Sequence, residues 1–259
     1  CLAVFVGSAA LLLWQVNQSW LRAVPASGGE YVEGLLGTPR FINPLLASAS
    51  VDRDLTTLIY SGLLRSAETG QFIPDLAESY TVSPNGLIYN FTLKPNLVWH
   101  DGEPVTADDV IFTITKAKEP ALKSPRRASW EGVEVEKIDD RHITFKLKQP
   151  YALFLENLTL GLLPAHRWQK ISPEIFPFTD LNREPIGTGP YQISAIRRDR
   201  DNLPLAYTFT PFRRFALGKP RIAQVIIRFY SNEETLLSAY RRGEIAALNS
   251  LDPATARAF

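Results

Sequence analysis

The stretch PDLAESYTVSPNGLIYNFTLKPNLVWHDGEPVTADDVIFTIT, residues 74–115, is the part of this chain that decides its fold. Its turns, its strand and its helix start follow one another closely, and each has its own local signal. Residues 83–86, Ser-Pro-Asn-Gly, predict a turn because proline presets φ and Asn-Gly tolerates positive φ. Tyr89, Phe91 and Leu93 alternate with polar residues, which predicts a strand with one buried face.

The second half of the stretch predicts another turn and then a helix. Asp101-Gly102 is the turn signal. Thr106 is suited to cap a helix, and Asp109 stands three residues later, close to a capping-box arrangement. The apolar residues that follow at helical spacing give this helix a face to bury.

The F-x-L strand, the W-x-D-G turn and the T-A-x-D-V helix start of this stretch resemble a known family. It is the family 5 solute-binding proteins, the peptide- and nickel-binding receptors of ABC importers. Further blocks are similar to the family and occur in its order: Tyr60-Ser61-Gly62-Leu63, Gln149 to Leu155, Pro185 to Tyr191, and Gly243-Glu244-Ile245. Several blocks in register are much more specific than any one of them.

The resemblance implies an α/β fold of the periplasmic-binding-protein type (type II), with two lobes around a cleft and an inserted α/β subdomain. On that analogy, residues 25–60 and 170–259 build the first lobe, in two parts. Residues 61–169 form the inserted subdomain. The second lobe would follow Phe259 and is expected to be missing from this chain.

Outside the stretch, the sequence pattern predicts further elements. We expect a helix over residues 54–64 and β-hairpins over residues 133–147 and 191–212. A strand over residues 222–230, a helix capped by Ser231 and a strand over residues 245–248 should form a βαβ unit, hence a parallel pair. Residues 118–129 are polar and contain proline, which indicates a surface loop.

Composition excludes several classes of function. The formal net charge is +1 with both signs interspersed, so nucleic-acid binding is not expected, and pairs such as Arg213-Arg214 are interpreted as solvated faces. The single cysteine, Cys1, excludes a disulfide within the chain and a cysteine-based metal site. The common hydrolase templates and the phosphate loop are absent, so we expect no enzyme and no cofactor.

Residues 100–109 crowd one histidine and four carboxylates, namely His100, Asp101, Glu103, Asp108 and Asp109. These residue types ligate divalent ions. Roles in a turn and at a helix start explain the same residues. We therefore expect no metal site.

Residues 1–16 are almost wholly apolar, and three interpretations of residues 1–24 stay open. They are an uncleaved membrane anchor, a secretory signal peptide and a buried core helix. Trp14 and Trp20 would suit a membrane interface. The chain contains no methionine, so we expect its N-terminus to be cut or incomplete.

The resemblance also implies where a ligand would lie. In the peptide-binding members, an extended ligand pairs with backbone near the first strand of the first lobe, which is β-augmentation. We therefore expect Leu36, Gly37 and Thr38 to contact the ligand through backbone groups that the protein leaves unpaired. An ordinary strand that ends at a glycine turn explains the same three residues.

The expected function is that of the substrate-binding component of an ABC transporter. It would capture peptides, or a similar small solute, in the periplasm or at the cell surface and deliver them to ABC permease subunits. An N-terminal helix would anchor it to the cytoplasmic membrane. The alternative is a membrane-tethered recognition or signalling module that keeps the fold without transport.

Overall fold

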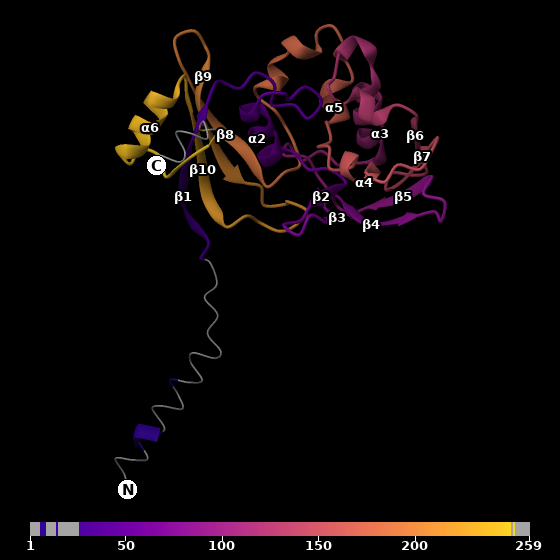
Figure 1. Ribbon diagram of the computed structural model, residues 1–259, viewed down its shortest axis with the longest axis horizontal. Helices are drawn as coiled ribbons and strands as arrows, with labels where there is room; N and C mark the ends of the chain where they lie inside the picture. The colour runs from indigo at the N-terminus through magenta and orange to yellow at the C-terminus, as the bar shows by residue number, and fades with distance from the viewer. Residues whose placement is uncertain (1–5, 9–13, 15–25, 250, 252–259) are drawn as a thin grey trace.

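The structure is a computed structural model that describes residues 6–8, 14, 26–249 and 251. Figure 1 shows its helices and strands. They are β1 (Gly28–Leu36), α2 (Ser50–Ile59), β2 (Leu64–Ser66), β3 (Phe72–Pro74), β4 (Ala77–Val82), β5 (Ile88–Leu93), α3 (Ala107–Lys118), β6 (Val133–Lys137), β7 (His142–Leu147), α4 (Phe154–Asn157), α5 (Ala165–Trp168), β8 (Tyr191–Arg198), β9 (Pro204–Pro211), β10 (Ile222–Tyr230), α6 (Glu233–Arg241) and β11 (Ala247–Leu248).

Two larger sheets organise these elements. One has the strand order β11-β1-β10-β9-β8, and the other, antiparallel, has the order β4-β5-β7-β6; β2 and β3 pair separately. Helix α6 covers one face of the five-stranded sheet and α2 the other (Figure 1). The predicted hairpins and the strand over residues 222–230 are confirmed.

The first strand sits between the two strands of the predicted βαβ unit. β1 pairs in parallel with β10 on one side and with β11 on the other, so the predicted pairing of β10 with β11 is wrong. The residue that lets α6 pack over this inserted strand is Gly34. A Cβ there would lie 2.5 Å from Leu236 Cδ1 and 2.6 Å from Ile245 Cδ1.

Helix α2 is displaced from its predicted position. It runs from Ser50 to Ile59, so the prediction of residues 54–64 is wrong at both ends. Residues 60–64 are extended because other segments take their backbone groups. The Ser61 carbonyl accepts from the Leu162 N–H at 3.0 Å, and the Leu64 N–H donates to the Leu158 carbonyl at 3.0 Å.

The cap of α6 also differs from the prediction. Asn232, and not Ser231, is the N-cap, and its Oδ1 accepts from the Thr235 N–H at 2.9 Å. The helix therefore starts one residue later than a cap at Ser231 would place it, and asparagine is as suitable a cap as serine. Gly243, with φ of 68°, follows the end of the helix.

The decisive stretch folds as its local signals predict. The Gly86 N–H donates to the Ser83 carbonyl at 2.8 Å and closes the first turn. In the strand that follows, Tyr89, Phe91 and Leu93 are buried. The capping box at Thr106 is complete, because Asp109 Oδ2 accepts from the Thr106 N–H at 2.9 Å.

The hydrophobic core continues through both larger sheets. Aromatic contacts build the part under the four-stranded sheet, where the rings of Phe91 and Phe145 stand edge to face at 5.6 Å. Trp99 and Trp130 are both buried. Among the described residues, no strand of one larger sheet pairs with the other. The division at residues 60–61 and 169–170 stays a prediction.

The interpretations of residues 1–24 fall almost wholly outside the described residues. Within the described part of the chain, no helix has the length and the apolar character needed to cross a bilayer.

Candidate functional site

A hollow of about 910 Å³ opens on the surface of the described residues. It lies between α2, the extended segment after it, and the segments around residues 126–130 and 151–161. Its lining mixes charged, hydroxyl and apolar side chains, including Arg53, Thr56, Thr57, Tyr60, Ser61, Arg65, Asp75, Arg126, Ser129, Trp130, Tyr151, Glu156, Asn157 and Leu217. Ligand sites typically combine an apolar surface with a few polar groups in this way.

Helix α2 supplies one wall because it is amphipathic. Its Val51, Leu55 and Ile59 side chains are buried in the core. Arg53 and Thr56 lie on the other side of the helix and face the hollow, with Thr57 and Tyr60. The wall therefore carries hydroxyl groups and one guanidinium, whose Nη1 donates to the Ser48 carbonyl.

The opposite wall is held by a contact between two segments distant in sequence. The Asn157 Nδ2 donates to the Ser129 carbonyl at 2.8 Å and thus joins the segment around residues 126–130 to the segment around residues 151–161. Trp130 lies buried behind that contact, while Tyr151 is partly exposed. The prediction that residues 118–129 form a polar surface loop is thus incomplete, because this segment contains two short 3₁₀ helices and borders the hollow.

The positive and negative charges around the hollow do not balance, and one carboxylate oxygen lacks a hydrogen-bond partner among the described residues. Three arginines face two carboxylates, Asp75 and Glu156. Asp75 is only 6% exposed, and its carboxylate interacts with the Ser61 hydroxyl, but its Oδ1 has no hydrogen-bond partner among the described residues. Burial raises the pKa of the Asp75 carboxyl, while the Lys94 and Arg65 charges oppose that shift.

The Gly-Thr-Gly-Pro turn positions the wall formed by residues 60–66. The Gly189 N–H donates to the Ile59 carbonyl at 2.7 Å, and a Cβ at Gly187 would lie 1.9 Å from that same oxygen. Only glycine permits this approach. Thr188 Oγ1 accepts from the Ser61 N–H at 3.3 Å. The bend at residues 188–190 thus meets the C-terminal end of α2.

His100 locks this turn to the rest of the fold. Its Nδ1 accepts from the Gly187 N–H at 3.3 Å, so its Nε2–H donates to the Gly189 carbonyl at 3.1 Å. The ring edge also packs on Phe212, with centroids 4.8 Å apart. Burial lowers the pKa of His100 from 6.5 to about 4, so the ring is neutral at pH 7.

The predicted ligand residues lie elsewhere. Leu36 is the last residue of β1, Gly37 and Thr38 follow it, and none of the three lines the hollow. Gly37 has φ of 92°, and its N–H donates to the Tyr230 carbonyl at 2.8 Å. The expectation of unpaired backbone groups is therefore wrong for the Gly37 N–H. Leu36 packs with the side chains that α6 covers, and Thr38 is exposed.

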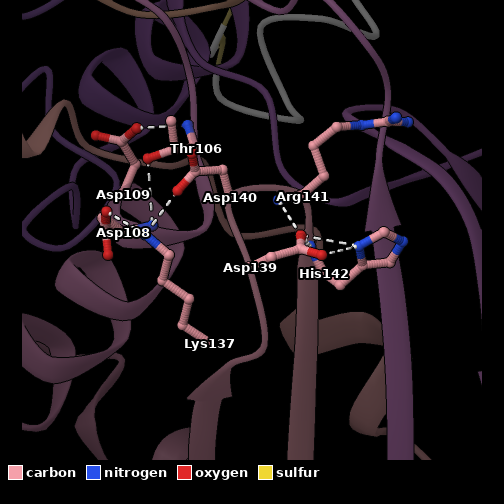
Figure 2. Close-up of polar contacts among 8 residues, drawn as sticks. All are labelled: Thr106, Asp108, Asp109, Lys137, Asp139, Asp140, Arg141 and His142. Carbon is pink, nitrogen blue, oxygen red and sulfur yellow. Dashed lines mark hydrogen bonds and ion pairs between the residues drawn. The ribbon is translucent and has the colours of Figure 1, made fainter.

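Three of the four carboxylates of residues 100–109 have structural partners: Asp101, Asp108 and Asp109. Figure 2 shows Asp108 and Asp140 on either side of the Lys137 ammonium, at 2.7 and 2.8 Å. Asp109 closes the capping box and accepts from the Ala165 N–H at 2.8 Å. The Asp101 Oδ2 lies 2.9 Å from the His166 Nε2.

A second cluster in Figure 2 surrounds the turn between β6 and β7. There Asp139 accepts from the backbone N–H groups of Arg141 and His142 and contacts the His142 ring at 2.8 Å. Among the described residues, no group of three or more His, Cys, Asp or Glu side chains has the arrangement of a metal site.

Comparison with known proteins identifies the family of this fold. The model of a family described as "Bacterial extracellular solute-binding proteins, family 5 Middle" matches residues 71–259. The chain belongs to the family 5 solute-binding proteins. This family 5 chain is 32% identical over 172 residues to the oligopeptide-binding protein AppA of Bacillus subtilis, covering 65% of this chain and 32% of AppA.

Other relatives agree with that assignment. The dipeptide-binding protein of Escherichia coli K12 is 29% identical over 186 residues, covering 63% of this chain and 35% of that protein. The solved structure of AppA with a nonapeptide matches with a TM-score of 0.78 and 26% identity, covering 86% of this chain and 44% of AppA. The family 5 chain spans about a third of the length of these curated relatives, which are binding proteins.

Proposed function

We propose that this chain is part of the substrate-binding component of an ABC transporter, and that the component captures peptides or a similar small solute outside the cytoplasmic membrane. The observation that carries the proposal is the fold, which matches peptide-bound AppA over most of the described residues. ABC permease subunits are the proposed partners. The names of the relatives, which include ABC transporter peptide-binding proteins, support the same role.

The hollow is the proposed contact surface for ligand side chains. Its volume of about 910 Å³ accommodates a small peptide, and its hydroxyl and guanidinium groups offer donors to ligand carbonyls and carboxylates. Leu36, Gly37 and Thr38 stay proposed as backbone contacts. Because the Gly37 N–H is already paired with Tyr230, a ligand strand there would have to use the remaining backbone groups.

The finer architecture is proposed on the same basis. Residues 25–60 and 170–259 would act as one lobe and residues 61–169 as an inserted subdomain, which the separate pairing of the two larger sheets supports. The apolar sequence of residues 1–16 supports an anchor in the cytoplasmic membrane, or a signal segment.

Calorimetry with adjacent arginine variants tests the hollow. Arg126 lines it, whereas Arg127 does not and instead pairs with Glu131 at 3.8 Å. Mixed di- to pentapeptides would be titrated into the full-length gene product and into its Arg126→Gln and Arg127→Gln variants. We expect Arg126→Gln to weaken peptide binding about tenfold, equal to about 1.4 kcal/mol, and Arg127→Gln to leave it unchanged.

Two outcomes would contradict different parts of the proposal. Equal affinity of both variants and the unsubstituted protein would remove the hollow from the ligand site. No heat of binding with any peptide, from a protein whose folding is verified by circular dichroism, would remove peptides as the ligand class.

A further inference from the structure

The connection between β9 and β10 carries an uncompensated positive charge. Four cations lie within residues 213–221, here called the basic loop: Arg213, Arg214, Lys219 and Arg221. All four side chains are exposed. The sequence has no aspartate or glutamate between Asp201 and Glu233, so no acidic residue nearby along the chain balances them.

The fold does not supply the missing negative charge either. Among the described residues, none of the four cations forms an ion pair, and the one side-chain hydrogen bond is from Arg214 Nη2 to the Asn96 carbonyl at 3.4 Å. Some other cations of the chain are paired. Arg141, for example, meets Glu78 at 2.7 Å, and Lys146 meets Glu136 at 2.7 Å.

Exposed apolar side chains accompany these cations. Leu217 within the basic loop is 39% exposed and also lines the hollow, whereas Ile222, directly after the loop, is 38% exposed and does not line it. Cations interleaved with apolar side chains are the composition of surfaces that bind the headgroup region of a bilayer.

The position of the loop brings it next to the apolar end of the chain. The Gly28 N–H, at the start of β1, donates to the Arg221 carbonyl at 2.8 Å. The residues before β1 therefore join the fold beside the basic loop, and residues 1–21 contain no charged side chain. The β8–β9 turn lies at the other end of the same sheet (Figure 1).

We propose that the basic loop docks on the anionic phospholipid headgroups of a membrane surface. Each cation held near such a surface raises the membrane partition coefficient about fivefold, and salt screens this attraction. Ile222 would enter the headgroup boundary beside Arg221. The docked loop would fix which end of the five-stranded sheet faces the bilayer. None of the four cations lines the hollow, so the proposal is independent of its ligand.

A fluorescent label beside the loop tests this contact. The full chain would carry Cys1→Ser and Ala223→Cys, with bimane on the new thiol, since Ala223 is exposed and follows Arg221 closely. Acrylamide quenching would be compared on vesicles of phosphatidylcholine alone and of equal parts phosphatidylcholine and phosphatidylglycerol. We expect the quenching constant to be at least twofold lower on the anionic vesicles and to recover in high salt.

Two matched double variants separate the loop from net charge. Arg213→Gln with Arg214→Gln should abolish the difference between the vesicles. Arg197→Gln with Arg200→Gln removes the same charge at the β8–β9 end and should preserve the difference. Equal quenching on both vesicles, a difference that persists in the loop variant, or equal losses in both variants would overturn the proposal. Circular dichroism verifies folding, and peptide titration of the same variants reports separately on the hollow.

Discussion

Acid should destabilise this protein through one buried histidine. His100 is neutral in the folded state because both ring nitrogens are engaged with the turn at residues 187–189. A proton on Nδ1 would remove the lone pair that accepts the hydrogen bond from the Gly187 N–H. Burial also disfavours the positive charge of the protonated ring. The folded state therefore resists protonation at a pH where the unfolded chain accepts a proton readily.

The magnitude follows from the pKa of the two states. The pKa of His100 is 6.5 in the unfolded chain and about 4 in the folded state. Above pH 6.5 the ring is neutral in both states, and its stabilising contribution is fully present. Between pH 6.5 and 4 only the unfolded state binds the proton, so stability falls by about 1.4 kcal/mol per pH unit, reaching about 3 kcal/mol in total.

Urea denaturation of a His100→Gln variant isolates this effect, because glutamine does not titrate. At pH 7 the variant should be less stable by about 2 kcal/mol, the cost of disturbing two buried hydrogen bonds. On acidification to pH 4.5, the difference between the wild type and the variant should shrink by about 2 to 3 kcal/mol. The exposed His142 on the β6–β7 turn provides the control, and a His142→Gln variant should not change this pH profile as strongly. A difference between wild type and His100→Gln that stays constant from pH 7 to 4.5 would refute the reasoning.

Three further substitutions test the packing and capping described above. Gly187→Ala should lower the free energy of unfolding by about 3 kcal/mol, because the new Cβ would overlap the Ile59 carbonyl. Gly218→Ala, at a φ of 94° in open space, should lower it by only about 1 kcal/mol. Equal effects of the two variants in urea denaturation would contradict the close-approach argument. Thr106→Ala should cost about 1 kcal/mol through loss of the cap, and an unchanged melting temperature would argue against it. Asp75→Asn should stabilise the protein by about 1 kcal/mol at pH 7, because the buried carboxylate is ionised there at a cost in free energy. The gain should vanish near pH 3, where the carboxyl is protonated in both the folded and the unfolded state. A loss of stability at pH 7 would show that the ionised form is needed.

Features set by neighbouring residues were predictable from the sequence. The turn at Asn85-Gly86 and the capping box of Thr106 with Asp109 depend on atoms a few residues apart, so the local pattern contains all the information. The alternation of Tyr89, Phe91 and Leu93 likewise predicted the buried face of β5. The family resemblance rested on these same blocks, and the family match confirms it.

Features set by distant partners were not predictable in this way. No local signal ends α2 at Ile59, because its end depends on backbone contacts with residues 187–189. Likewise, the local sequence of β11 does not indicate that the strand pairs with β1, the first strand, and not with β10. The hollow draws residues from segments more than a hundred positions apart, and its best local signal is the polar side of α2 that carries Arg53 and Thr56.

The Pro-Ile-Gly-Thr-Gly-Pro-Tyr block explains why a motif can be diagnostic of a binding protein without supplying its main binding groups. Gly187 and Gly189 approach the end of α2 so closely that the helix cannot continue, and residues 60–64 must leave it in an extended conformation. That extended segment then pairs with residues around 158–162 and becomes a wall of the hollow. The glycines thus act on the site through the path of the backbone. A substitution there would alter the shape of the hollow before it altered any group that faces a ligand.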